Sequence, residues 1–275
     1  MTNDTWTLGD RTIRRLGFGA MRLPLAPDRD AAAGVLRRAV ELGADHIDTA
    51  AFYFMNGLAA NDLIRDAALG PEITVATKVG PARAPDDPFP SGQVPTGALR
   101  GEVERNLREL GRDRLDLVYL RPGGIDAPTE DSIAERFEVL AALREEGLIR
   151  HLGVSHVTLP QLDEARRIAP VVAVQNRFDV SQPADTAMLA VCERDGIAYV
   201  PYFPLGGFGL PDDPRVAKVA ERLGATVPQV LLAGLLALSP AALAIPGTSS
   251  RAHLEENMGA AGLRLTGADV AELTG

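Results

Sequence analysis

The chain has 275 residues, of which 46% are hydrophobic, so it can bury a large core. Its formal net charge of −9 argues against binding to nucleic acid or to an anionic membrane surface. The single cysteine, Cys192, excludes an internal disulfide and is typical of a reducing compartment. The first residues lack the pattern of a signal peptide, and no apolar run approaches the roughly 20 residues that span a bilayer. We therefore expect one cytoplasmic domain over residues 1–275, with no nucleic-acid or membrane partner.

Apolar patterning predicts the secondary structure in chain order. Residues 5–14 alternate around Gly9 and Asp10, which indicates a hairpin with a tight turn. A repeated pattern of short apolar strand, loop and amphipathic helix follows it. The expected strands are Leu16–Ala20, His46–Thr49, Ile73–Lys78, Leu115–Leu120, His151–Ser155, Val172–Gln175, Ile197–Tyr202 and Leu243–Pro246.

The helices between these strands complete the prediction of the fold. Apolar residues spaced by three and four give the clearest helical faces at Ala32–Ala39, Leu99–Leu110 and Ile133–Leu140. Eight strands alternating with helices predict an α/β fold with a parallel sheet, closed as a (β/α)8 TIM barrel behind an N-terminal β-hairpin. An open doubly wound sheet is the alternative. It is disfavoured because no Gly-x-Gly-x-x-Gly pattern follows the first strand, and residues 20–27 do not resemble the start of a helix.

An acid, a phenol and an amine lie at the ends of two neighbouring strands. Asp48 ends one strand, a short turn leads to Tyr53, and Lys78 ends the next strand. The carboxylate would keep the amine charged and in place, and the amine would lower the pKa of the phenol. Lys78 and Lys218 are the only lysines among 28 basic residues, and a buried lysine can exchange its proton whereas arginine cannot. The alternative is that a lysine lies at this strand end by chance.

Polar residues recur at the same end of the predicted barrel. In a (β/α)8 barrel the C-terminal ends of the strands form the active-site face. Six polar residues lie at or just beyond those ends, which favours an enzyme: Asp48, Lys78, Arg121, Ser155, Gln175 and Tyr202. The long loop at residues 80–98 contains five prolines and also follows a strand, so we expect it to form part of a pocket wall.

Six segments resemble, in sequence and in order, motifs of the aldo-keto reductase superfamily: DTAAFY (48–53), ATKVG (76–80), GVS (153–155), VQN (174–176), YFPLGG (202–207) and IPGTSSRAHLEEN (245–257). The resemblance extends over nearly the whole chain. It implies a barrel that reduces small-molecule aldehydes or ketones to alcohols with NADPH and without a metal. We expect a monomer.

The resemblance also implies roles for individual residues. Tyr53 would be the general acid, Lys78 would lower its pKa and Asp48 would hold Lys78. Ser155 and Gln175 would hydrogen-bond the carboxamide of the nicotinamide, and Tyr202 would stack on the nicotinamide ring. Residues 247–257 would bind the adenosine phosphate of the cofactor. The cofactor contacts implied are Met21, Ser155, His156, Gln175, Tyr202, Phe203, Leu205, Gly247, Thr248, Ser249, His253, Glu256 and Asn257.

Three positions depart from the pattern of the family. Arg121 stands where a histidine is usual, as in a branch of bacterial members. His156 replaces an asparagine that helps to bind the carboxamide. His253 replaces an arginine that contacts the 2′-phosphate, so NADH is also a possible cofactor, and Arg251 is a candidate substitute for that arginine.

Other interpretations of these residues remain open. Arg121 could face outward and pair with Asp126 or Glu130. Ser155 and Gln175 could merely cap helices. A Schiff-base lyase would use Lys78 as its nucleophile. A regulatory protein would bind NADPH with little turnover.

Overall fold

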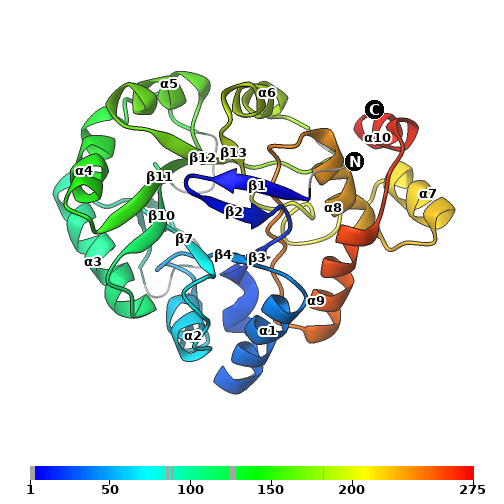
Figure 1. Cartoon of the computed structure of the whole chain (residues 1–275), viewed down its shortest axis with the longest axis horizontal. Coiled ribbons are helices and arrows are strands. Elements are labelled where there is room, and N and C mark those ends of the chain that lie inside the picture. The colour runs from blue at the N-terminus through cyan, green and yellow to red at the C-terminus, as the bar shows by residue number, and fades with distance from the viewer. Residues whose placement is uncertain (1–3, 85–86, 88–89, 124–127, 182) are drawn as a thin grey trace.

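The computed structural model describes residues 4–84, 87, 90–123, 128–181 and 183–275. The chain starts with an antiparallel hairpin of β1 (Thr5–Leu8) and β2 (Arg11–Arg14), with Gly9 at a φ of +63° in the turn. Seven strands then form one parallel sheet in the order β13-β12-β11-β10-β7-β4-β3 (Figure 1). They are β3 (Phe18–Gly19), β4 (His46–Asp48), β7 (Thr74–Val79), β10 (Leu115–Leu120), β11 (Ile149–Ser155), β12 (Val171–Gln175) and β13 (Ala198–Tyr199).

Residues 242–246 close the ring between the first and last strands of this sheet. Ala242 forms a parallel bridge with Tyr199, and Ala244 forms one with Leu16. The predicted barrel and its hairpin are therefore confirmed. The predicted strand Leu243–Pro246 forms only single bridges, and the predicted strand Ile197–Tyr202 is reduced to Ala198–Tyr199, because Pro246 and Pro201 have no N–H to donate to a neighbouring strand. The first predicted strand, Leu16–Ala20, is reduced to Phe18–Gly19. Residues 20–27, which did not resemble the start of a helix, contain the 3₁₀ helix Ala20–Leu25, and the first α-helix starts at Arg29.

Helices surround the sheet, and the hairpin lies across its centre in Figure 1. The three predicted apolar faces lie in α1, α3 and α4 and are buried, apart from the partly exposed Leu107. The helices are α1 (Arg29–Glu41), α2 (Ala60–Asp66), α3 (Leu99–Leu110), α4 (Ala134–Glu145), α5 (Leu159–Ile168), α6 (Thr186–Asp195), α7 (Pro214–Leu223), α8 (Val227–Leu238), α9 (Arg251–Met258) and α10 (Gly267–Thr274).

Two small hairpins that the sequence did not predict follow β4 and β7. They are β5 (Phe54–Met55) with β6 (Leu58–Ala59), and β8 (Pro81–Ala82) with β9 (Gly92–Gln93). Because β4 and β7 are parallel strands, both hairpins lie beyond the C-terminal ends of the strands, on the same side of the barrel. The loop at residues 80–98 contains the second hairpin, and its residues 85, 86, 88 and 89 lie outside the described part of the chain.

No single helix in the described ranges is long and apolar enough to cross a membrane. Only α7 and α8 taken together have the required length and hydropathy, and they are bent by 97° at the break between them.

Arg15 links the closing segment to the end of α8. Its Nε donates to the carbonyl oxygen of Ala242 at 3.1 Å, and one terminal nitrogen donates to the carbonyls of Leu236, at 2.6 Å, and Ser239. Arg15→Met keeps the length of this buried side chain but removes its donors. We expect it to lower the free energy of unfolding by about 3 kcal/mol, because buried carbonyls lose their partners.

Urea denaturation compares this variant with Arg14→Met, in which the neighbouring exposed arginine is changed. The control should shift the free energy of unfolding by less than about 0.5 kcal/mol, as exposed substitutions usually do. Equal shifts in the two variants would show that the Arg15 hydrogen bonds contribute no net stability.

Candidate active site

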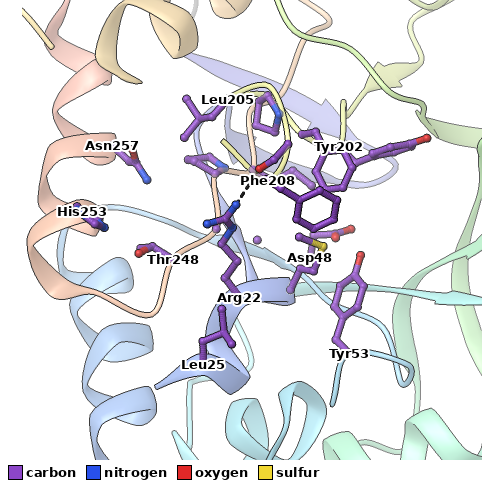
Figure 2. Close-up of a pocket in the computed structure, with 18 of the residues that line it drawn as sticks. Arg22, Leu25, Asp48, Tyr53, Tyr202, Leu205, Phe208, Thr248, His253 and Asn257 are labelled. Atoms are coloured by element: carbon purple, nitrogen blue, oxygen red, sulfur yellow. Dashed lines mark hydrogen bonds between the residues drawn. The ribbon is translucent and has the colours of Figure 1, made fainter. Parts of the chain in front are cut away.

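A cavity of about 640 Å³ lies at the C-terminal ends of the strands. Asp48 at the end of β4 and Gln175 at the end of β12 line it, as do Arg121, just after β10, and Tyr202. Figure 2 shows Asp48 and Tyr53 on one side of the cavity and the residues of α9 on the other. The sequence-predicted strand-end residues therefore converge on one site.

Lys78 is buried beside the cavity, with only 1% of its surface exposed. Its Nζ lies 2.5 Å from Asp48 Oδ1, donates to the carbonyl oxygen of Thr49 at 2.9 Å, and is 5.0 Å from the centroid of the Tyr53 ring. The other oxygen of Asp48 accepts a hydrogen bond from Gln175 Nε2 at 2.7 Å. Two partners hold the ammonium group in place. This arrangement disfavours a Schiff-base lyase, which needs a lysine open to its substrate.

The environment of Tyr53 acts on its pKa in both directions. Burial raises the pKa of the phenol and is the largest effect, while Lys78 lowers it, Asp48 raises it and Arg121 lowers it. Lys78 thus acts in the predicted direction, and the pKa of Tyr53 is raised because desolvation outweighs the effect of the two cations. A phenol with a raised pKa stays protonated at neutral pH and can donate its proton.

Arg121 faces into the barrel. It is 6% exposed, donates to Ser155 Oγ at 3.2 Å, and places its guanidinium carbon 4.8 Å from the centroid of the Tyr202 ring. The outward-facing interpretation was therefore wrong. Glu130 is exposed on the surface, and Asp126 lies outside the described residues. A permanent cation consequently lines the cavity close to the predicted catalytic residues.

Most of the predicted cofactor residues line the same cavity. They are Met21, Gln175, Tyr202, Phe203, Leu205, Gly247, Thr248, His253, Glu256 and Asn257. Three are not on its surface. Ser155 and His156 are buried, in contact with Arg121 and Tyr202 respectively, and Ser249 is half-buried in the loop before α9. His156 reaches the site through Tyr202, because its Nδ1 lies 2.8 Å from the tyrosine hydroxyl.

The start of α9 forms the other end of the cavity. Thr248 Oγ1 accepts a hydrogen bond from the Ser250 N–H at 3.0 Å, and Ser250 caps the helix. His253 is exposed and lines the cavity. Arg251 does not line it, and its Nε lies 3.4 Å from a Glu255 oxygen instead. In this structure Arg251 is therefore not placed to substitute for the missing arginine.

The donors and acceptors in the cavity fit a nicotinamide cofactor. Gln175 Oε1 is buried and accepts no hydrogen bond from any described residue, while the amide nitrogen of the same side chain is bound to Asp48. A carboxamide N–H would supply the missing donor. Gly19 and Gly247 form the wall where the barrel closes. A Cβ on Gly247 would lie 2.4 Å from the carbonyl oxygen of Gly19, so a larger residue would disturb this wall.

Several residues of the cavity wall were not predicted, among them Arg22, Leu25, Phe52 and Met55. Arg83 lies in the loop at residues 80–98, which was expected to form part of the wall. Arg22 donates to the carbonyl oxygen of Gly207 at 2.8 Å, the dashed line in Figure 2, and so joins the 3₁₀ helix to the loop after Tyr202. Arg83 donates to the carbonyl of Phe52 at 2.6 Å. The position of Arg22, just past the first strand, was a signal that the sequence did contain.

A parallel barrel with a buried acid and lysine beside a tyrosine, at the active-site end of its strands, defines an enzyme of the (β/α)8 class. The chain belongs to the aldo/keto reductase family, whose model matches residues 15–275. It is accordingly an oxidoreductase, which confirms the family resemblance and the enzyme class expected from the sequence.

Three similar proteins illustrate this membership. Pyridoxine 4-dehydrogenase of Escherichia coli (strain K12) is 45% identical over 97% of this chain and 96% of its own. An uncharacterised oxidoreductase of Schizosaccharomyces pombe is 36% identical over 98% of this chain and 88% of its own. A crystal structure of an aldo-keto reductase from Klebsiella pneumoniae in complex with NADPH is 25% identical, with a TM-score of 0.82, and covers 99% of this chain and 94% of the other.

Proposed function

We propose that the protein reduces aldehyde or ketone carbonyls to alcohols with NADPH, and that Tyr53 donates the proton to the carbonyl oxygen. The observation that supports this most strongly is the hydrogen-bonded pair of Lys78 and Asp48 beside the Tyr53 ring. Asp48 keeps Lys78 charged, and the charge of Lys78 favours the phenolate that is left when the proton moves. We further propose that the protein is a single-domain monomer, and that it is cytoplasmic, which the lone cysteine supports.

The residues at the two ends of the cavity have separate tasks in this proposal. Gln175 binds the carboxamide of the cofactor and Tyr202 stacks on its ring, while Thr248, His253 and Asn257 bind the adenosine end. When bound, the cofactor supplies the hydride. The NADPH complex of the Klebsiella pneumoniae reductase supports this choice of cofactor. NADH remains a second cofactor in the proposal, because His253 is not an arginine.

Arg121 directs the choice of substrate. We propose that the chain belongs to a bacterial branch that has this arginine in place of the usual histidine. Its guanidinium pairs well with anionic oxygens. An aromatic aldehyde with an ionised hydroxyl beside the carbonyl fits this cation. Pyridoxal, the product expected from dehydrogenating pyridoxine at carbon 4, is such an aldehyde, and the name of the Escherichia coli relative supports it.

The proposal is tested by following the oxidation of NADPH and NADH with a panel of carbonyl compounds. We expect turnover with NADPH, fastest for pyridoxal and for aldehydes with a carboxylate or phenolate, and slower for simple alkyl ketones. Tight binding of NADPH without turnover of any carbonyl would contradict the proposal. Such a result would favour a regulatory role.

His253 provides a test of the preference for NADPH. We expect His253→Arg to raise the ratio of NADPH to NADH affinity by about 10-fold, because a charge-assisted hydrogen bond to the 2′-phosphate adds roughly 1.5 kcal/mol. Fluorescence titration with both cofactors measures the ratio. Arg251→Ala is the matched control, since Arg251 pairs with Glu255 and lies outside the cavity wall. If Arg251→Ala weakens NADPH binding and His253→Arg does not strengthen it, our placement of the 2′-phosphate is wrong.

A further inference from the structure

A buried polar cluster lies between the strands and the outer helices, directly behind the proposed proton-donating set. Thr49 and Thr77 in the strand region, and Asn61 and Asn106 on α2 and α3, are each 0% exposed. The other buried residues of these two helices are apolar: Ala60, Leu63, Ile64, Leu99, Val103 and Leu110. Burying amides and hydroxyls costs free energy unless they are hydrogen-bonded, so the cluster needs a physical explanation.

The cluster satisfies its own hydrogen bonds. Thr49 Oγ1 donates to Asn61 Oδ1 at 2.9 Å, and Thr77 Oγ1 donates to Asn106 Oδ1 at 2.6 Å. Asn61 Nδ2 joins the two halves by donating to Asn106 Oδ1 at 3.0 Å. Asn106 Nδ2 in turn donates to the carbonyl of Glu102 in its own helix, at 2.9 Å. One network therefore fixes the ends of β4 and β7 relative to α2 and α3.

A second branch of the network reaches the turn that leads to Tyr53. Asn61 Nδ2 also donates to Glu109 Oε2 at 3.0 Å, and the other oxygen of Glu109 accepts from Arg105 Nε at 2.6 Å. Arg105 then donates to the carbonyl oxygen of Ala51 at 3.3 Å. Ala51 is in the short segment between Asp48 and Tyr53, so the same network supports that segment from behind.

Asp48 and Lys78 each have a sequence neighbour in this network, and Ala51 lies two residues before Tyr53. Thr49 follows Asp48, and its carbonyl oxygen accepts the hydrogen bond from Lys78 Nζ. Thr77 precedes Lys78 in β7. Neighbouring side chains of a strand point to opposite faces, so the threonine side chains reach the helices while their neighbours face the barrel interior.

We propose that Asn61 and Asn106, together with Glu109 and Arg105, are positioning residues that fix the distance between Lys78 Nζ and the Tyr53 hydroxyl. The inference rests on the proposed function of that set. A displacement of about 1 Å at a reacting group can cost roughly 100-fold in rate. A hydrogen-bond network that holds Lys78 and Tyr53 at a fixed distance therefore affects the rate of proton transfer from Tyr53.

The test removes one attachment at a time. Thr49→Val keeps the side-chain shape but removes the donor to Asn61, and Thr49→Ser restores a hydroxyl. Arg105→Met removes the support of Ala51, and Arg108→Met is its control, because Arg108 is exposed on the same helix. We expect Thr49→Val and Arg105→Met to lower kcat by about 10-fold. Their KM and NADPH dissociation constant should stay unchanged, the solvent deuterium isotope effect on kcat should rise, and both controls should behave as the wild type.

Two results would overturn the inference. One is a loss of thermal stability in Thr49→Val and Arg105→Met with kcat and its isotope effect unchanged, which would mean that the network only stabilises the fold. The other is equal kcat for Thr49→Ser and Thr49→Val. Because Arg105 is partly exposed, Arg105→Met decides the question if Thr49→Val does not fold. Tyr53→Phe is measured in parallel. If it keeps wild-type turnover, the proposed function and this inference fall together; if only Tyr53→Phe loses activity, the inference alone fails.

Discussion

Tyr53→Phe is expected to lower kcat for carbonyl reduction by at least about 100-fold, the usual scale for a positioned proton donor. The substitution removes one hydroxyl and keeps the ring against which Lys78 lies. Gln175 and the residues of α9 that are proposed to bind the cofactor are unchanged in this variant. The NADPH dissociation constant should therefore change by less than about twofold, which is well below the effect of losing one hydrogen bond. Steady-state kinetics and fluorescence titration measure the two quantities separately.

Lys78→Met serves as the companion variant. It removes the charge that favours the phenolate, so the phenol becomes a still weaker acid and turnover should fall to a similar extent. Lys218→Met is the control, since the only other lysine is paired with Glu272 on the surface. Near-normal turnover in Tyr53→Phe with a good substrate would show that another group protonates the carbonyl oxygen.

Arg121 should determine which carbonyl compounds react fastest. We expect Arg121→Ala to raise KM for anionic aldehydes by about 10- to 100-fold, because a charged hydrogen bond contributes roughly 1.5–3 kcal/mol. Neutral aldehydes should be affected less. Arg121→His should shift kcat/KM toward neutral aldehydes, since a neutral imidazole donates a hydrogen bond without a permanent charge.

The matched control for Arg121 is Arg83→Met in the same cavity. The Arg83 guanidinium already donates to the carbonyls of Phe52 and Asp87, so its loss should alter the ranking of substrates less than Arg121→Ala does. The measurement is kcat/KM for matched pairs of neutral and anionic aldehydes. An unchanged ranking in both Arg121 variants would refute the proposed role of this arginine, even though it lines the cavity.

The sequence predicted the barrel because its strands are short apolar runs separated by helical faces. In β7 and β10, for example, every residue is buried. The segment at residues 242–246 forms only single bridges, since Pro246 has no N–H to donate to a neighbouring strand. The strand after α6 has only two residues, since Pro201 interrupts the backbone hydrogen bonding in the same way. The β5-β6 and β8-β9 hairpins are two residues a side, too short for an alternating pattern to indicate them.

The site was partly predictable for a related reason. Parallel strands bring their C-terminal ends together, so Asp48, Lys78 and Gln175 could be grouped before their distances were known. The net direction of the Tyr53 pKa could not be predicted, since it depends on burial. The contact of Asn61 with Asn106 joins residues of two helices that are 45 positions apart in the sequence, and no local pattern indicates it.

The most direct test of the account is a single turnover with NADPH that carries deuterium in both positions at nicotinamide carbon 4, so that transfer from either face delivers the label. The enzyme is mixed with this cofactor and pyridoxal, and the alcohol is examined by mass spectrometry. We predict that one deuterium per molecule appears on the new alcohol carbon with the wild type, and that the rate of its appearance falls at least about 100-fold in Tyr53→Phe. Label that stays on the cofactor with every carbonyl tested, or equal rates in the two proteins, would contradict carbonyl reduction with Tyr53 as the proton donor.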